Sequence, residues 1–249
     1  ILITTLILKL PICNKAQISN IDALFEATSA VTATGSSVKD LAQQFTFWGQ
    51  LILLIAMQIG AVGFIIFFSL LFMISKRKLK LSDSIFLSNE INTNNYMSIK
   101  NKAKKIVQYT LVIEGMGAFL LAFAWIPRYG FGKGLWYSIF HSVSAFCNVG
   151  LDVFGSESLC AFREDIYINC VLIGLMFLGS LGFFVLENLV EWIPTRKKSK
   201  IQVESRLVLC VSFLIVGLGI LLIKVFDSQM TILQSLFCVI TARNTGLFT

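Results

Sequence analysis

Long apolar segments alternate with shorter segments of mixed character along this chain. Four of the apolar segments reach the roughly 20 residues that a helix needs to cross a bilayer, and the apolar opening, Ile1–Leu10, has the composition of the end of a fifth. Because these segments contain few charges, we predict that they are membrane-spanning helices. The four complete segments are Phe47–Ser75, Ile106–Ile126, Ile166–Ile193 and Leu207–Phe226.

Three shorter apolar segments lie between the long ones, and each leads into a stretch that ends at a glycine. Each is about three helical turns long, which is too short to cross a bilayer. The shared pattern is an apolar turn, Ser or Thr followed by Ala, a few small or polar residues, and then glycine. Repetition on this scale indicates one structural unit used several times around a common site. The short segments are Ala23–Val31, Leu135–Phe146 and Thr231–Thr241, and their glycines are Gly35, Gly150 and Gly246.

The repeated pattern predicts an all-α membrane protein made of tandem helix–pore-loop–helix units. Because the chain begins inside an apolar segment and stops shortly after Gly246, we expect a fragment truncated after the third glycine stretch. The predicted parts are unit 1 at 1–75 (first helix incomplete, pore loop 20–38, inner helix 47–75), a cytoplasmic linker at 76–103, unit 2 at 104–193 (pore loop 133–152), a cytoplasmic linker at 194–206, and an incomplete unit 3 at 207–249 (pore loop 228–249).

The placement of the charges predicts the orientation in the membrane. The chain is 56% hydrophobic and 14% charged, with a net charge of +7, and its mean hydropathy is +0.78. Eight of the 21 basic residues lie within 76–105 and five within 194–206, and such clusters remain cytoplasmic. We therefore expect a multi-pass protein of the plasma membrane with all three glycine stretches outside. Because most of the basic residues lie in two loops, we expect no nucleic-acid partner, and the loops could contact anionic membrane lipid.

The glycine-ending stretches have the chemistry of an ion filter. Potassium gives up its water only where carbonyl oxygens replace it, and glycine permits the backbone angles that aim successive carbonyls one way. The C-terminal dipole ends of the short helices would favour a cation nearby. We expect K⁺ to be the transported ion, with no covalently bound cofactor. The predicted ligands are the backbone carbonyls of Thr32, Ala33, Thr34 and Gly35, of Cys147, Asn148, Val149 and Gly150, and of Arg243, Asn244, Thr245 and Gly246.

A second small-residue motif recurs in the helices after the first two glycine stretches. Gln58–Phe64 reads QIGAVGF, and Phe177–Phe183 reads FLGSLGF. Each places two glycines three residues apart, a spacing that lets helices in lipid approach closely. We therefore predict close packing at Gly60 and Gly63 and at Gly179 and Gly182.

Four segments closely resemble the corresponding segments of potassium-uptake proteins of the Trk/Ktr superfamily: DALFEATSAVTATG, QIGAVGF, SIFHSVSAFCNVGLDVF and TARNTG. Plant HKT and fungal Trk proteins are distant relatives of this superfamily. The resemblance implies four units around one pseudo-fourfold pore, each giving one filter strand. It also implies a homodimer and a cytosolic nucleotide-binding regulatory ring. Glycine at Gly35, Gly150 and Gly246 implies a preference for K⁺, since a serine at the first position marks Na⁺ passage in this family.

Other functions stay open at this point. A Na⁺-permeable or Na⁺-coupled transporter of the same superfamily is one, and a truncated protein that does not transport is another. A membrane-embedded enzyme is a third, although the polar residues at the outer side show no catalytic spacing, and we expect no enzymatic activity. Those residues are His141, Asp152, Glu157, Glu164 and Asp165.

Several single polar residues are given structural interpretations. Arg243 is expected to pair with a carboxylate such as Glu26 or Asp152, because a charge at membrane depth needs a partner, and the alternative is electrostatic tuning beside the filter. His141, the only histidine, is expected to be a hydrogen-bonded structural residue, and the alternative is a proton carrier. Asp152 either gathers cations at the outer mouth or is a solvated loop acid. For Glu187 and Glu114, a position near a helix end would let the carboxylate reach the interface. The six scattered cysteines lack the spacing of a metal or disulfide framework.

Overall fold

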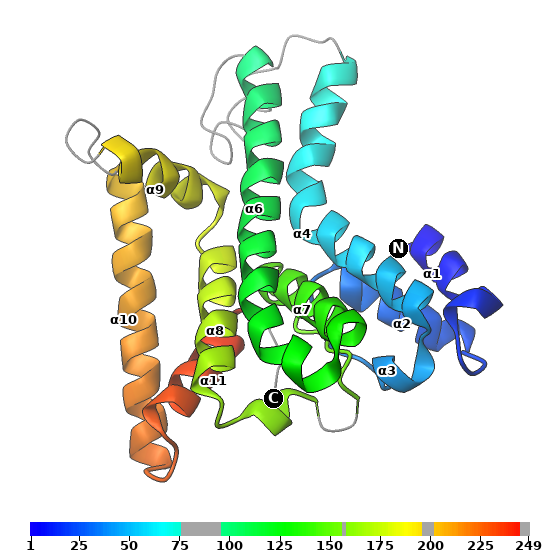
Figure 1. The fold of residues 1–249 in the computed structure, drawn as a ribbon. Coiled ribbons are helices and arrows are strands. Elements are labelled where there is room, and N and C mark those ends of the chain that lie inside the picture. The colour runs from blue at the N-terminus through cyan, green and yellow to red at the C-terminus, as the bar shows by residue number, and fades with distance from the viewer. Residues whose placement is uncertain (76–95, 156–157, 196–201, 245–249) are drawn as a thin grey trace.

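The computed structural model describes residues 1–75, 96–155, 158–195 and 202–244, and in these ranges the regular secondary structure is helical (Figure 1). An isolated antiparallel bridge joins Asn14 to Phe45. The expectation of an all-α chain is therefore confirmed for the described residues. Parts of both predicted linkers, 76–95 and 196–201, lie outside these ranges, as do Glu157, Thr245 and Gly246.

The N-terminal part begins with short elements and ends in a long helix. α1 (Leu2–Leu8) is followed by η1 (Pro11–Cys13), α2 (Asn20–Val31), α3 (Leu41–Gln44) and α4 (Phe47–Ser75). The Ser19 hydroxyl accepts a hydrogen bond from the Asp22 amide at 3.0 Å, and this cap starts α2 three residues before the predicted short helix.

The middle part again places a short helix before an apolar helix. α6 (Tyr96–Tyr129) runs into α7 (Phe131–Phe146), and η2 (Ser158–Phe162), α8 (Ile166–Ser180) and α9 (Phe183–Thr195) follow. Gly130, at φ +79°, separates α6 from α7, so α7 begins four residues before the predicted start at Leu135. Gly182, at φ +83°, separates α8 from α9. The prediction of one continuous helix over 166–193 is therefore wrong, because the left-handed backbone at this glycine ends α8.

The C-terminal part consists of α10 (Val203–Phe226) and α11 (Ile232–Asn244). Thr231 and Gln234 form a reciprocal cap, in which the Thr231 Oγ1 accepts from the Gln234 amide at 3.2 Å and the Gln234 Oε1 accepts from the Thr231 amide at 3.0 Å. This capping box explains the start of α11. The helix continues through Arg243 and Asn244, which therefore have helical rather than extended backbone.

The long helices are arranged with alternating direction. The end of α4, the start of α6, the end of α9 and the start of α10 lie at the upper end of the molecule in Figure 1. In the described part of the chain, the segments Lys104–Tyr129 and Val203–Phe226 are long and apolar enough to cross a membrane, and Phe47–Gly63 and Ile166–Ser180 form shorter apolar helices. Many large apolar side chains of α6 and α10 are exposed, as expected for helices that face lipid.

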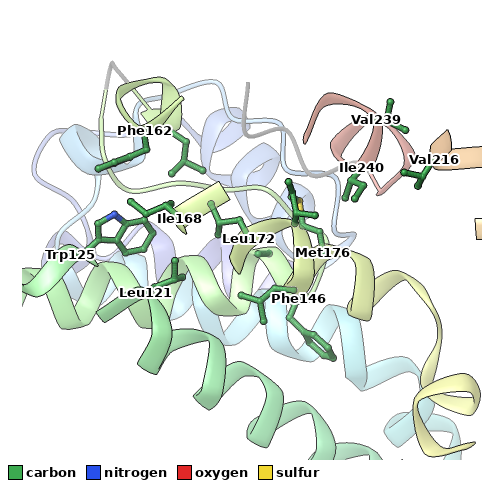
Figure 2. Packing of buried hydrophobic residues seen from close by; sticks show 14 of the residues in the cluster. Leu121, Trp125, Phe146, Phe162, Ile168, Leu172, Met176, Val216, Val239 and Ile240 are labelled. Atoms are coloured by element: carbon green, nitrogen blue, oxygen red, sulfur yellow. The ribbon is translucent and has the colours of Figure 1, made fainter. Parts of the chain in front are cut away.

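Two clusters of buried apolar side chains hold these helices together, and α7 contributes to both. The larger cluster joins α6, α7, α8, α10 and α11 around the fully buried Trp125 and Met176 (Figure 2). The other joins α1, α2, α4 and α7 around Phe45, Met57 and Phe140. Because α7 lies between the clusters, its C-terminal end and the loop that follows are fixed from both sides.

Candidate functional site

Two glycine-ending loops, 32–35 after α2 and 147–150 after α7, have the same backbone. We call them the first and second glycine loops. Ala33 and Asn148 both have φ +53°, and the closing glycines have φ +75° and +83°. In each loop the third residue donates its amide hydrogen to a serine carbonyl of the preceding helix: Thr34 to Ser29 at 3.0 Å and Val149 to Ser144 at 2.9 Å. Left-handed backbone at a non-glycine residue is uncommon, so its repetition at equivalent positions marks one loop structure formed twice.

The two glycine loops touch each other at Gly35. A Cβ atom built on Gly35 would lie 1.7 Å from the carbonyl oxygen of Val149, which no side chain permits. Glycine is therefore required here by the neighbouring loop as well as by its own φ. A pocket of about 140 Å³ lies against both loops and is also lined by Asp40 and Asp152.

A glycine of the following helix contacts the end of each short helix. A Cβ atom at Gly60 of α4 would lie 2.1 Å from the Val31 carbonyl oxygen, and one at Gly179 of α8 would lie 1.9 Å from the Phe146 carbonyl oxygen. The predicted close approach is confirmed at these two positions. It is wrong for their partners, because a Cβ at Gly63 would meet only Ile59 of its own helix and one at Gly182 would meet nothing within 4 Å.

A buried polar triad lies where the second glycine loop begins. The Gln58 amide nitrogen of α4 donates to Glu114 Oε2 of α6 at 2.9 Å. The Cys147 thiol lies 3.6 Å from Glu114 Oε1 and 3.5 Å from Gln58 Oε1. Glu114 is only 5% exposed, so the expected interfacial position of its carboxylate is wrong. The triad joins α4 and α6 to the first residue of the loop.

Arg243 and Asn244 form different contacts at the end of α11. The Arg243 guanidinium donates to the Ser212 hydroxyl of α10 at 2.8 Å and lies 5.9 Å from the centre of the Phe177 ring of α8. The expected carboxylate partners, Glu26 and Asp152, bind other groups, so that expectation is wrong. Asn244 donates to the Met176 carbonyl oxygen at 3.2 Å, and Asn148, with its amide nitrogen turned toward the same oxygen, donates to it at 3.0 Å.

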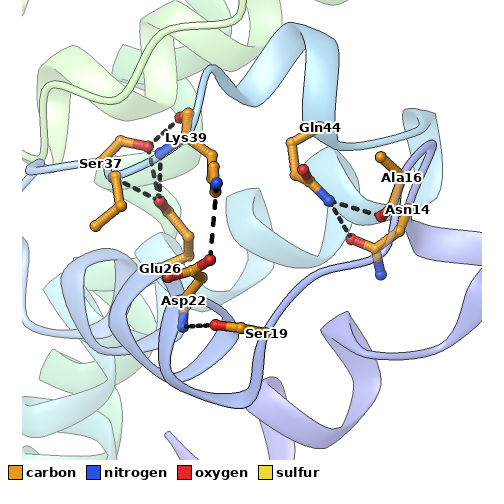
Figure 3. A network of polar contacts seen from close by, with 9 residues as sticks. Asn14, Ala16, Ser19, Asp22, Glu26, Ser37, Lys39 and Gln44 are labelled. Carbon is orange, nitrogen blue, oxygen red and sulfur yellow. Dashed lines mark hydrogen bonds and ion pairs between the residues drawn. The ribbon is translucent and has the colours of Figure 1, made fainter.

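Two fully buried polar residues of the short helices contact the segments that follow the glycine loops. Glu26 of α2 accepts hydrogen bonds from the segment that follows Gly35 (Figure 3). His141 of α7 has its Nδ1 2.7 Å from the Tyr137 carbonyl oxygen, and its ring stacks on Phe154. The structural interpretation of His141 is therefore confirmed. Glu26 lies nine positions before Gly35, and His141 lies nine positions before Gly150. This equivalent placement is the signal in the sequence that marks the two residues as a pair.

Three further acidic residues singled out in the sequence, Asp152, Glu187 and Asp165, have local contacts. Asp152 accepts from the Phe154 amide at 3.1 Å and from the Ser158 hydroxyl at 2.7 Å. Glu187 pairs with Lys105 of α6 at 3.3 Å, and Asp165 pairs with Arg128 at 2.7 Å. In the ranges that the structure describes, no three His, Cys, Asp or Glu side chains are grouped as a metal site would require.

Apolar helices that pack around polar loops are the arrangement of a helical membrane protein, and the comparisons with known proteins give its class. Residues 2–210 match the TrkH family, described as cation transport protein, and the chain belongs to this family. It is 34% identical over 218 residues to the potassium/sodium uptake protein NtpJ of Enterococcus hirae, a match that covers 87% of this chain and 48% of the relative.

Two further relatives are named Ktr system potassium uptake protein B. The one from Vibrio alginolyticus is 34% identical over 194 residues, covering 78% of this chain and 42% of the relative. The one from Bacillus subtilis is 30% identical over 227 residues, covering 91% of this chain and 50% of the relative. The chain thus spans about half the length of these relatives. The resemblance to Trk/Ktr-type proteins is confirmed.

Proposed function

We propose that this chain forms part of the pore of a potassium-uptake system of the plasma membrane, and that backbone carbonyls of its glycine loops select the ion. The observation that carries the proposal is the pair of glycine loops, which share one backbone and lie in contact at Gly35 and Val149. Two strands of this kind would be two sides of a filter, and a ring of such carbonyls replaces the water of K⁺.

The proposed filter uses three strands from this chain, and α2, α7 and α11 are their pore helices. Thr32, Ala33, Thr34 and Gly35 form the first, and Cys147, Asn148, Val149 and Gly150 form the second. Arg243, Asn244, Thr245 and Gly246 lead into the third, for which the contact of both Asn148 and Asn244 with Met176 offers indirect support. A fourth strand would complete the pseudo-fourfold ring. The basic segments 76–105 and 194–206 are then cytoplasmic.

The proposal includes partners that the relatives suggest. Two relatives are named as proteins of a Ktr system, which supports a membrane subunit that works with other components. We propose a homodimer that associates with a cytosolic nucleotide-binding ring. The basic segments provide suitable charge for contact with acidic protein surfaces or anionic lipid.

Growth of a potassium-uptake-deficient bacterium at low K⁺ tests the function. The complete gene should restore growth, whereas Gly35→Ser should weaken rescue or admit Na⁺, because its side chain would collide with the Val149 carbonyl. Residues 1–249 expressed alone should not restore growth, because the proposed ring needs a fourth strand. Failure of the complete, membrane-inserted protein to rescue, even with its regulatory partner, would contradict potassium uptake.

Passage of Na⁺ is the second candidate, since one relative is named a potassium/sodium uptake protein. Uptake of both ions into proteoliposomes distinguishes the two. A filter selective for K⁺ should leave Na⁺ uptake near background, whereas comparable uptake of both ions would favour the second candidate.

A further inference from the structure

The structure contains a pair of buried side chains that hold the far ends of the glycine loops. Glu26 and His141 both lie nine residues before their glycine and both are 0% exposed. Burial of a carboxylate is costly unless several donors surround it, so Glu26 marks a place where a specific set of contacts is needed.

Glu26 gathers three donors from the segment directly after Gly35. Its Oε1 accepts from the Ser37 hydroxyl at 2.8 Å, the Val38 amide at 2.8 Å and the Lys39 amide at 3.3 Å (Figure 3). Two of the three donors are backbone amides, so the carboxylate fixes the path of the chain itself. The first glycine loop is thus attached to α2 on one side through the Thr34 amide and on the other side through Glu26.

His141 contacts the equivalent segment after Gly150 by stacking rather than hydrogen bonding. Its ring lies 4.4 Å from the ring of Phe154, centre to centre, with 27° between the planes. Trp125 of α6 packs against the edge of the same histidine at 5.1 Å. Phe154 is four residues after Gly150, as Lys39 is four residues after Gly35, so the two contacts act at the same point of the loop.

We propose that Glu26 and His141 are positioning residues that set the discrimination between K⁺ and Na⁺ by holding the outgoing end of each glycine loop. This inference rests on the proposed function. A carbonyl filter distinguishes the two ions through the number and placement of its oxygens. A loop released at one end can move its oxygens inward around the smaller ion, which lowers selectivity without removing the pore.

The test compares variants of the complete protein in proteoliposomes at equal insertion, with the ratio of K⁺ to Na⁺ uptake as the readout. Glu26→Leu removes the acceptor and should lower the ratio about tenfold, which corresponds to about 1.4 kcal/mol of discrimination. Glu26→Gln keeps an acceptor oxygen and should stay within about twofold of the wild type under the same conversion. Asp22→Ala is the matched control, because Asp22 is also an acid of α2 but pairs with the exposed Lys39 side chain, at 3.9 Å, rather than with the amides after Gly35.

A second set of variants examines the other loop. His141→Phe can still stack on Phe154 and should preserve the ratio, whereas His141→Leu should lower it. A wild-type ratio in inserted Glu26→Leu and His141→Leu proteins would overturn the proposal. If Glu26→Leu does not insert, Ser37→Ala replaces it: loss of one of the three donors should lower the ratio by at least about twofold, and an unchanged ratio would count against Glu26.

Hydrogen exchange separates this proposal from the proposed function. If the wild-type protein transports no K⁺, the proposed function fails. The contact between Glu26 and the segment after Gly35 is then tested by the hydrogen-exchange rates of the Val38 and Lys39 amides. Those amides should exchange faster in Glu26→Leu than in Asp22→Ala. Equal exchange in the two variants would overturn the role of Glu26.

Discussion

Two glycines on different helices touch the carbonyl oxygens that end the short helices, and a methyl group fits at neither. Gly60 lies against Val31, and Gly179 lies against Phe146. The sequence revealed these positions because the motif occurs twice. It did not reveal that the neighbouring Gly63 and Gly182 lack such contacts, since spacing alone does not say which glycine faces a neighbour.

Gly179→Ala should destabilise the protein by about 1–3 kcal/mol, the usual effect of an inserted methyl group in a packed interior. The measurement is the thermal unfolding midpoint in detergent. Gly174→Ala is the control on the same helix, because a Cβ at Gly174 would meet nothing within 4 Å. Equal midpoints for the two variants would contradict the close contact seen at Phe146.

Glu114→Ala should also lower the unfolding midpoint. The substitution leaves the half-buried Gln58 amide without its acceptor and the Cys147 thiol without one of its two acceptors, which costs about 1–3 kcal/mol. Met116→Ala, on the same helix but 61% exposed, should have little effect. A midpoint for Glu114→Ala as high as that of Met116→Ala would mean that the triad does not stabilise the fold.

The partners of single polar residues were the hardest features to predict. Charge alone suggested a carboxylate for Arg243, but the structure provides a hydroxyl and an aromatic ring from α10 and α8. Which helices become neighbours depends on the packing of several segments, and a repeat of local sequence does not contain that information.

Between elements, one ion pair joins the end of α6 to the start of α8. Arg128 donates to Asp165 at 2.7 Å, and Asp165 also accepts from the Ile168 amide at 3.2 Å as the N-cap of α8. Burial alone would raise the pKa of Asp165, but these hydrogen bonds and the nearby positive charge outweigh it, and the pKa lies below its ordinary value.

The Arg128–Asp165 pair should make stability depend on acid pH. Because the pKa is lowered in the folded state, the stabilisation is complete above the ordinary pKa of about 4 and is lost as the pH falls through the folded-state pKa. The pair is partly exposed, so we expect about 0.2–1 kcal/mol.

A double-mutant cycle of Arg128→Met and Asp165→Asn, measured by unfolding at pH 7 and pH 3, checks this effect. Because asparagine is also a good N-cap residue, Asp165→Asn keeps the cap of α8 and removes only the charge, which isolates the ion pair. A coupling energy that is equal at both pH values would contradict the assignment.

The break between α8 and α9 is a feature of the helices that hydropathy did not predict. The run 166–193 is largely apolar, and its acidic residues, Glu187 and Glu191, lie near its end, so hydropathy predicts one helix. The chain nevertheless turns at Gly182 with φ +83°, whereas α4 continues past the equivalent Gly63.

Gly182→Val should destabilise the protein by about 1–2 kcal/mol because a β-branched residue resists left-handed backbone. The unfolding midpoint of Gly182→Asn should lie closer to that of the wild type, and the reverse order would contradict this account.

For the whole molecule, hydropathy and charge predicted most of the arrangement. The helix directions, the three short helices and the glycine loops all follow from segment length and repeated sequence. The orientation of the molecule in the membrane is a prediction that native and introduced cysteines can test.

Cys160 lies exposed in η2, in the part of the chain that we expect outside the cell. A membrane-impermeant maleimide added to intact cells should label it, and Cys160→Ser should abolish the signal. A cysteine at position 197 in the Cys160→Ser background should react only after permeabilisation. Cys170, exposed on the apolar helix α8, should remain unlabelled because the lipid around this helix excludes a membrane-impermeant reagent. If residue 160 reacted only after permeabilisation and residue 197 reacted in intact cells, the predicted topology would be reversed.

The ends of the short helices α7 and α11 lie beside different polar side chains. The carboxylate of Glu114 contacts Cys147 at the end of α7, and the guanidinium of Arg243 contacts Ser212 at the end of α11. In a channel assembled from four identical subunits, every inherited substitution appears four times around the axis. Tandem duplication within one gene removes that constraint. In the proposed pore, mutation can therefore alter one side at a time while the other sides continue to hold the ion.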